Sequence, residues 1–580
     1  MPETESSSPI SSPVKLGSWV RRGLTPEREF FCLSAMILGF GVLAWTSLKQ
    51  KSVTFDEFVH LPAGLSYLRT GVFRIEPFNS PLIRMLAALP WEWSDVKLPL
   101  REGWKQANPW VMGYDFMYAN ADSYQQIYLR SRAVMVGLAA LLLVLVWVWT
   151  RRLFGPRSAL AAVLLTAFDP NFMAHAQLVT ADVGGSLFFF GDVLAGWSFC
   201  RRPSWPRAGL VGAVLGLAIL AKFTAVLLLP LLPLLAVSYR LTGGKNLSWR
   251  RMGLGLGLAF CVAWITICSC YGWKGFGAPV HHYTWQSRSL QRVAELLPPG
   301  LPLPLPAACL RGLDLVRAYQ EESVQGYFLG EITNQTQPLY YLVALAVKTP
   351  LATLAMLLLG LLALGRAKKT DWPDLLFLSL PPVLVILYLS LFSDRNLGVR
   401  ATLPALPFLA MIGSRLLAPA GLPLRRWVRG GLALLLAGTV ASNLLIYPDY
   451  LAYFNCAAGG PSRGYRLLAD SNLDWGQDLL GLKRYLDANG IDRICLAYFG
   501  RVDPAIYGIQ YNFPRDFQQC DTLAVSVQLL LGFSYSLMDG KQLTENEPWQ
   551  FNWLLQEKPL TTIGYSIWIF KKSDQGWPVP

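Results

Sequence analysis

Long apolar segments alternate with short polar segments along most of this chain. Many of them approach the roughly 20 residues that an α-helix needs to cross the hydrocarbon core of a bilayer. The stretch 208–237 fits either one bent pair or two helices, so the pattern predicts about eleven spans. The predicted spans lie within residues 30–48, 133–149, 158–168, 181–199, 208–237, 252–271, 339–364, 375–392, 401–412 and 432–447. We therefore expect a polytopic α-helical membrane protein.

Composition supports this interpretation. Of the 580 residues, 53% are hydrophobic and only 15% are charged, which does not fit a single soluble domain. The formal net charge of +14 would suit nucleic-acid binding, but the basic residues cluster in short loops between apolar segments. Basic residues in such loops act as orientation signals. We expect contact with membrane lipids and no nucleic-acid partner.

The basic loops fall on alternate connections, so they share one side of the membrane. The positive-inside rule assigns that side to the cytoplasm. Two long loops, residues 49–130 and 272–338, then lie on the outer face together with everything after residue 447. We expect a multi-pass protein of a bacterial inner membrane, whose active site faces outward.

Both ends of the chain differ from the predicted membrane domain, residues 30–447. Residues 1–29 are rich in Ser and Pro and then basic, which predicts a disordered cytoplasmic tail. In residues 448–580 charges are frequent and apolar runs are short, which predicts a small extracytoplasmic α/β domain. Its expected elements are a helix at 478–489 and strands at 494–499, 522–529 and 566–571.

The nine cysteines form no C-x-x-C pair, and most lie in or beside apolar segments. A cysteine in such a place behaves as a small hydrophobic residue. Cys495 and Cys520 lie instead in the hydrophilic C-terminal part, where they could pair if that part is outside the cytoplasm. The sequence leaves this pairing open.

An acidic pair, Asp56-Glu57, follows the first apolar segment where that helix leaves the bilayer. The same loop later contains Ser-Pro-Leu-Ile-Arg at residues 80–84, which ends in the cation Arg84. Transfer of a group from a lipid phosphate needs a carboxylate that accepts a proton and a cation that holds the phosphate. This loop therefore carries the first candidate chemistry.

The loop resembles the first external loop of the GT-C-fold glycosyltransferases that use lipid-phosphate sugars. They include the dolichyl-phosphate-mannose protein mannosyltransferases and the bacterial aminoarabinose transferases. Those families carry an Asp-Glu pair after the first membrane helix and a Pro-Pro-Leu-x-Lys type of motif in the same loop. Here Ser80 replaces the first Pro and Arg84 replaces the Lys. The resemblance implies a GT-C-like fold and a phosphate-binding role for Arg84.

Asp56 is the first candidate for the general base that removes the proton of the acceptor hydroxyl. It matches the catalytic Asp of the resembling families position for position. Glu57 is either the alternative base or a residue that positions the start of the helix.

Two further ionisable residues lie inside or beside apolar segments, where a charge is costly without a partner or a function. Asp182, in L-V-T-A-D-V-G-G, begins a predicted span and matches an Asp that lines the cavity of the resembling families. The alternative is a helix N-cap. Lys222 lies in the middle of about thirty apolar residues and is a candidate for binding the donor phosphate. The alternative is a lysine that extends from a hairpin turn to the interface.

Three more cations are candidates for the donor phosphate. Lys348, in A-V-K-T-P-L, matches a Lys-Thr-Pro of bacterial members of the superfamily. Arg395 and Arg400 lie in S-D-R-N-L-G-V-R-A-T-L-P, and Arg400 matches the Arg of an Arg-Tyr-x-Leu-Pro pattern. An arginine can hold a phosphate with charge-assisted hydrogen bonds. The alternative role of Arg400 is a juxtamembrane anchor.

We expect no metal and no cofactor. The chain has only four histidines, and His281-His282 are adjacent rather than at ligand spacing. Asp470, Asp474 and Asp478 recur every four residues, but without the glycine-containing loop of a calcium site. They suit a capped helix start or a wall of the acceptor cleft.

Together these features favour an inverting glycosyltransferase that takes a sugar from a polyprenyl-phosphate donor. The acceptor would be the hydroxyl of a glycan, lipid or protein on the outer face. No nucleotide-binding loop is visible, in agreement with a lipid-linked donor. A transporter or flippase of lipid-linked sugars is the alternative, although no inverted repeat is apparent. A third possibility is a scaffold without catalytic activity whose outer domain binds cell-wall material.

Overall fold

The computed structural model describes residues 25–244, 247–322, 325–365, 371–393, 395–418, 425–539, 542–574 and 576–577. Most of the predicted cytoplasmic tail, residues 1–29, lies outside the described residues. The first helix, α1 (Pro26–Leu48), begins four residues before the predicted start of the first span. The side chain of Thr25 accepts a hydrogen bond from the Arg28 N–H and caps this helix.

Every predicted apolar segment is helical. The helices are α1, α6 (Tyr124–Phe154), α7 (Pro156–Ala167), α9 (Ala181–Arg201), α10 (Trp205–Ala221), α11 (Leu228–Leu241), α12 (Trp249–Cys270), α15 (Tyr340–Lys348), α16 (Leu351–Leu364), α17 (Trp372–Phe392), α18 (Leu406–Ser414) and α19 (Arg426–Leu445). Among the described residues, seven helices are long and apolar enough to cross a membrane, or eight if the bent pair α15 and α16 is one span. The chain thus has the architecture of a multi-pass integral membrane protein.

The difference from about eleven predicted spans has a structural cause. α7 and α10 are apolar but shorter than the seven spanning helices, and α18 is shorter still. The stretch 208–237 proves to be two helices, because the chain leaves α10 in an extended conformation at Lys222. A short 3-10 helix, η4 (Phe223–Leu227), then leads into α11. The break places Lys222 at a helix end.

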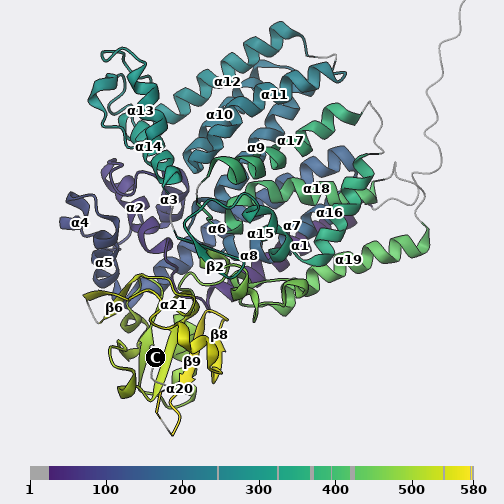
Figure 1. Cartoon of the computed structure of the whole chain (residues 1–580). Helices are drawn as coiled ribbons and strands as arrows, with labels where there is room; N and C mark the ends of the chain where they lie inside the picture. Colours follow the sequence, from purple (N-terminus) through teal and green to yellow (C-terminus); the bar gives the residue numbers. More distant parts are fainter. Residues whose placement is uncertain are drawn as a thin grey trace, which may run out of the picture.

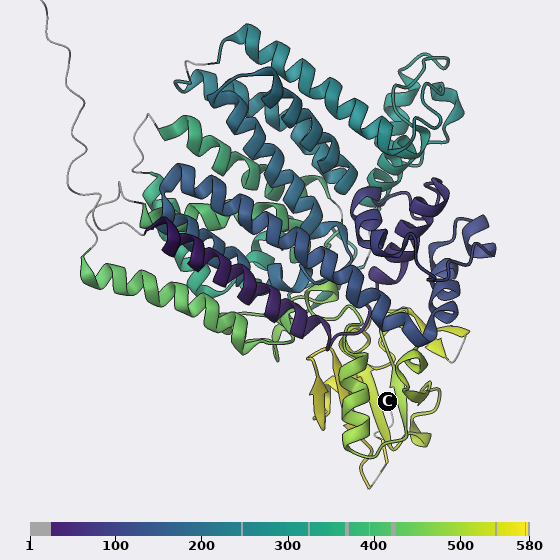
Figure 2. The same cartoon turned by 180° about the vertical axis from the view of Figure 1, so that it is seen from behind.

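Each of the two long loops contains short helices. The first loop carries α2 (Glu57–Thr70), α3 (Pro81–Ala88), α4 (Glu102–Lys105) and α5 (Pro109–Ala119). The second carries α13 (Arg288–Glu295), α14 (Ala307–Glu321) and the hairpin of β1 (Gly326–Phe328) and β2 (Glu331–Thr333). Figures 1 and 2 show these loop helices gathered at one end of the bundle of long helices.

The C-terminal part contains a five-stranded mixed sheet in the order β4-β3-β5-β9-β8. Its strands are β3 (Arg493–Ala497), β4 (Gln510–Asn512), β5 (Thr522–Ser526), β8 (Thr561–Ile563) and β9 (Ile567–Lys571). β3 runs parallel to β4 and β5, whereas β9 runs antiparallel to β5 and β8. A separate hairpin joins β6 (Ser536–Asp539) to β7 (Gln542–Glu545).

Three of these strands and the helix α20 (Leu479–Ala488) lie where the sequence predicts them. The second predicted strand is shorter than expected, because the chain turns after Ser526 into α21 (Val527–Leu530). Cys495 in β3 and Cys520 before β5 form a disulfide. The pairing that the sequence left open is therefore present in this structure.

The sheet is joined to the helical bundle by the chain that follows α1. The backbone N–H of Ser52 donates to the carbonyl of Gln477, and that of Phe55 donates to the carbonyl of Trp475. Lys51 forms ion pairs with Asp449 and with Asp478 of the C-terminal part. One hydrophobic core continues from the long helices into the sheet. These contacts hold the start of the first long loop against residues 475–478.

The disulfide gives a prediction for the nine cysteines. Seven cysteines are free and two are paired, so a thiol reagent should label seven in denatured protein purified without reductant. After reduction the number should rise to nine, and peptide mapping should assign the two protected thiols to Cys495 and Cys520. Cys456→Ser, which removes an exposed free thiol, should lower both numbers by one. Nine labelled thiols before reduction would contradict the pairing.

Candidate active site

The structure brings Asp56 into contact with Arg400, which lies 344 residues later in the chain. Asp56 immediately precedes α2, at the point where the loop after α1 ends. Arg400 lies in the 3-10 helix η7 (Val399–Ala405), which follows Gly398 with its positive φ of 79°. Nη1 of Arg400 lies 2.9 Å from Oδ2 of Asp56, and both side chains are partly exposed. A carboxylate and a guanidinium therefore meet where both can reach a ligand.

The same guanidinium extends the cluster to Asp182 and Lys222. Nη1 of Arg400 lies 3.8 Å from Oδ2 of Asp182, whose other oxygen lies 2.6 Å from Nζ of Lys222. The N-cap of α9 is Thr180, and Asp182 lies in the first turn with its carboxylate directed to the two cations. Lys222 retains 24% side-chain exposure. We call Asp56, Arg400, Asp182 and Lys222 the charged cluster.

The C-terminal part contributes an aromatic ring and a third carboxylate. The guanidinium of Arg400 lies over the ring of Trp475, 4.4 Å from its centroid. Burial raises the pKa of Asp470, while the nearby charge of Arg400 lowers it and that of Asp56 raises it further. Asp470 thus lies close enough to Arg400 and Asp56 for their charges to act on its carboxyl group.

The other two members of the Asp470 series point elsewhere. The carboxylate of Asp474 accepts the N–H of Gly476, whereas that of Asp478 pairs with Lys51. The helix start accounts for neither, because α20 has no side-chain cap at Asp478. Among the described residues, no group of three or more His, Cys, Asp or Glu side chains could hold a metal ion. The four-residue spacing therefore does not create one site.

Glu57 is the most enclosed acidic residue of the loop, although it adjoins Asp56. Its carboxylate is fully buried, and its oxygens lie 2.8 Å from Nε and 2.5 Å from Nη2 of Arg132. The N–H groups of Thr54 and Val179 also donate to it. Burial alone would raise the pKa of Glu57, but Arg132 and these donors hold it below its ordinary value. The buried carboxylate has no surface on which to meet an acceptor.

Two of the five predicted phosphate-binding cations, Arg400 and Lys222, belong to the charged cluster. Arg84 is fully buried, pairs with Glu76 at 3.0 Å and donates to backbone carbonyls. The ammonium of Lys348 is buried and donates to the carbonyls of Leu451 and Asn472. A role of Arg84 or Lys348 in phosphate binding stays a prediction, and their burial does not favour it.

Arg395, the remaining predicted phosphate-binding cation, lies outside the charged cluster and contacts Tyr319 and Glu322. Its guanidinium lies over the ring of Tyr319, 3.2 Å from the centroid, and pairs with Glu322 at 2.9 Å. Glu322 is 68% exposed, so this pair lies at the surface. Burial raises the pKa of Tyr319, the charge of Arg395 lowers it, and the charges of Asp56 and Arg400 also act on it. Arg395 therefore borders the charged cluster through Tyr319.

An apolar cavity of about 630 Å³ lies between the long helices and the second long loop. Its walls come from α10, η4, α12 and α14, and they include Phe223, which directly follows Lys222. Tyr388 of α17 closes part of the wall and donates a hydrogen bond to Gln320. The cavity has the size and the apolar lining that suit a hydrocarbon chain.

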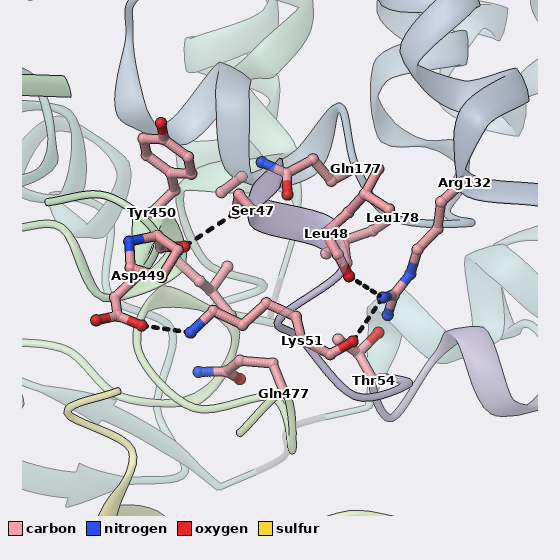
Figure 3. A pocket seen from close by; sticks show the side chains of 13 residues that line it. Ser47, Leu48, Lys51, Thr54, Arg132, Gln177, Leu178, Asp449, Tyr450 and Gln477 are labelled. Atoms are coloured by element: carbon pink, nitrogen blue, oxygen red, sulfur yellow. Dashed lines mark hydrogen bonds and ion pairs between the residues drawn. The ribbon is translucent and has the colours of Figure 1, made fainter. Parts of the chain in front are cut away.

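A smaller cavity of about 30 Å³ is lined in part by Lys51 and Thr54, which precede Asp56. Figure 3 shows it between the end of α1 and residues 448–451, with Lys51 paired to Asp449 and Arg132 donating to the carbonyls of Leu48 and Lys51. This volume admits about two water molecules. It belongs to the support of the loop rather than to a substrate site.

Residues 116–267 match the family model described as dolichyl-phosphate-mannose-protein mannosyltransferase. Over these residues the chain is similar to that family of membrane glycosyltransferases. The matched segment is about a quarter of the chain and contains Arg132, Asp182 and Lys222. It confirms the resemblance predicted from the Asp56 loop, which itself lies outside the matched residues. No curated protein matches the chain.

Two solved structures show a more distant similarity. ArnT from Cupriavidus metallidurans bound to undecaprenyl phosphate is 12% identical, with 94% of this chain and 99% of that chain covered and a TM-score of 0.48. The archaeal oligosaccharyltransferase AglB from Archaeoglobus fulgidus, in complex with an inhibitory peptide and a dolichol-phosphate, is also 12% identical. There the coverage is 74% of this chain and 56% of that chain, with a TM-score of 0.43.

The burial of the Glu57–Arg132 pair predicts a large effect on stability. Arg132→Leu leaves the carboxylate of Glu57 buried without its partner, which should lower the free energy of unfolding by about 3 kcal/mol. Lys483→Ala, which removes one partner of the exposed Lys483–Asp487 pair, should cost less than about 1 kcal/mol. Thermal unfolding of both variants in detergent measures the difference. Equal small losses would show that the buried pair does not hold the loop.

Proposed function

We propose that this protein is an inverting glycosyltransferase that moves a sugar from a polyprenyl-phosphate donor to an acceptor hydroxyl. The observation that carries the proposal is the charged cluster. It joins a candidate base, Asp56, to two cations, Arg400 and Lys222, and the residue after Lys222, Phe223, lines an apolar cavity. The similarity to the mannosyltransferase family over residues 116–267 supports the same reaction class.

In the proposed reaction Asp56 removes the proton of the acceptor hydroxyl while the oxygen of that hydroxyl attacks the anomeric carbon. The bond between that carbon and the phosphate oxygen breaks as the new glycosidic bond forms, so a single displacement inverts the configuration. The leaving group is the polyprenyl phosphate. Arg400 and Lys222 stabilise the negative charge that develops on its phosphate oxygens. Asp182 holds both cations in place.

The proposed donor position follows from the arrangement of polar and apolar groups. The prenyl chain occupies the apolar cavity between α10, α12 and α14, and the phosphate extends past Phe223 of the cavity wall to Lys222. Arg400 exchanges part of its contact with Asp56 for the phosphate, which leaves Asp56 available to the acceptor. The ring of Trp475 limits the movement of the Arg400 side chain during this exchange.

Glu57 is proposed as a positioning residue rather than as a base. Its buried carboxylate joins three separate parts of the chain, namely Thr54, Arg132 and Val179. Asp56 is its neighbour in sequence, so this network determines where Asp56 lies. Loss of the network would move the base without removing it.

We further propose that residues 448–580 form a domain outside the cytoplasm and that the charged cluster lies on the same outer face of a bacterial inner membrane. The disulfide supports this location, because such bonds persist in oxidising compartments. Trp475 of this part contacts Arg400, and its carbonyl accepts the N–H of Phe55. The proposed domain and the charged cluster therefore share one side.

Substitution of the candidate base tests the proposal directly. Asp56→Asn keeps the size of the side chain but removes the proton acceptor, so turnover should fall by about two to four decades. The assay combines purified protein, a panel of labelled polyprenyl-phosphate sugars and a membrane extract that supplies acceptors. Asp122→Asn, at an exposed aspartate of the same loop, should retain full turnover. Near-full turnover of Asp56→Asn would overturn its role as base.

The cations give a second test, in which Lys348 is the contrasting residue. Arg400→Ala and Lys222→Ala should each weaken donor binding by about 1.5–3 kcal/mol, because each loses a charge-assisted hydrogen bond. Lys348→Met leaves two carbonyls without their donor, so it should lower the unfolding temperature while the folded protein keeps its donor affinity. Donor affinity is measured as retention of the labelled lipid. A reversed pattern would move the phosphate site to Lys348.

A further inference from the structure

A charged pocket lies at the far end of α9 and α10, away from the charged cluster. It has a volume of about 390 Å³ and is formed by the last turns of α6 and α9 and by the start of α10. Its lining consists of Arg152, Trp197, Ser198, Arg201, Arg202 and Arg207. We call it the arginine pocket. Four guanidinium groups and no acidic side chain line it.

Helix geometry separates the arginine pocket from the charged cluster. Arg132, which holds Glu57, and Arg152 are both on α6, and the twenty residues between them span about 30 Å. Asp182 and Arg201 are likewise at opposite ends of α9. A distance of about 30 Å equals the thickness of the hydrocarbon core. A phosphate in the charged cluster therefore cannot reach the arginine pocket.

The positive charge of the pocket is poorly neutralised by the protein. Asp374 lies 3.5 Å from Nη1 of Arg201 and also accepts a hydrogen bond from the indole of Trp197 at 2.8 Å. Arg152 and Arg202 form no ion pair with any part of the chain that the structure describes. Like charges that converge on one small volume repel one another, and an anion in that volume relieves the repulsion.

The pocket is also held in shape without a ligand. Nη1 of Arg207 donates to the carbonyl of Arg202, which closes the short turn between α9 and α10. The guanidinium of Arg201 lies over the ring of Trp197, 5.3 Å from its centroid. An orientation signal needs only positive charge near the membrane. It does not need arginines from three helices around one pocket.

We propose that the arginine pocket binds a phosphate group, supplied by the headgroup of an anionic phospholipid or by a free phosphate. Arginine suits this ligand, because its planar guanidinium can donate two parallel hydrogen bonds to phosphate oxygens. Basic pockets between the ends of membrane helices also hold anionic headgroups. Trp197 provides an aromatic wall of the kind found where membrane and water meet. Binding at this pocket does not require the proposed glycosyl transfer.

The test compares lipid retention in two matched double variants of the full chain. Each protein is placed in nanodiscs of phosphatidylcholine mixed with phosphatidylglycerol, and retained lipid is measured by native mass spectrometry. Arg152→Gln/Arg202→Gln should reduce phosphatidylglycerol retention by about tenfold or more. Arg250→Gln/Arg251→Gln removes the same charge from exposed arginines at the start of α12 and should leave retention unchanged. Equal retention in both double variants would overturn the proposal.

A second measurement uses the unaltered protein and does not depend on how the variants fold. In nanodiscs of phosphatidylcholine alone, the unfolding temperature is measured with and without inorganic phosphate, and then with phosphatidylglycerol in the disc. A rise with phosphatidylglycerol alone assigns the site to a lipid headgroup, and a rise with inorganic phosphate assigns it to a free phosphate. Either rise should be absent in Arg152→Gln/Arg202→Gln. No rise with either ligand in the unaltered protein would overturn the proposal.

Discussion

The buried ion pair of Glu57 and Arg132 is the constraint on which the candidate active site depends. Removing both charges from water is expensive, and their mutual contact with the surrounding hydrogen bonds offsets that cost only when every donor is in place. Those donors come from the loop after α1, from α6 and from the segment before α9. One carboxylate thus fixes three parts of the chain, and Asp56 adjoins it on the accessible side.

The charged cluster follows from this arrangement. Asp56, Arg400, Asp182 and Lys222 alternate in sign, so each charge has an opposite neighbour within 3.8 Å. Partial burial strengthens such contacts relative to water. In the proposed function the same alternation provides two cations for the phosphate and one carboxylate for the proton, and Phe223, which follows Lys222 in the chain, lines the apolar cavity. The structure therefore combines a cluster of alternating charges with an apolar cavity large enough for a hydrocarbon chain.

The two ends of the long helices carry different chemistry. At one end carboxylates and cations balance, whereas the arginine pocket at the other end has four guanidinium groups and one nearby carboxylate. Because α6 and α9 connect both ends, a phosphate held in the arginine pocket would stabilise the helices that position Arg132 and Asp182. The physical link is the rigid helix itself, about 30 Å long.

Neighbouring residues illustrate the limits of prediction from the chain alone. Asp56 and Glu57 are adjacent acidic residues with similar side-chain chemistry. Only the packing of α2 buries Glu57 and leaves Asp56 accessible. Arg84 and Arg400 were both candidates for the phosphate, although Arg84 stands where the motif has a Lys and Arg400 matches an Arg. The difference is that Glu76 lies close enough to pair with Arg84, and a pairing within eight residues of loop depends on how that loop folds.

The sequence by itself determined the membrane character, the positions of the apolar helices, the change of composition after residue 447 and the candidates Asp56, Asp182, Lys222 and Arg400. These features are local, because hydrophobicity and the cost of a charge in an apolar segment depend on residues within a few helical turns of one another. Only the tertiary structure decided which charges meet, that 208–237 is two helices, and that four arginines converge. Such decisions depend on contacts between residues far apart in the chain, and a Coulomb interaction is decided by distance in space.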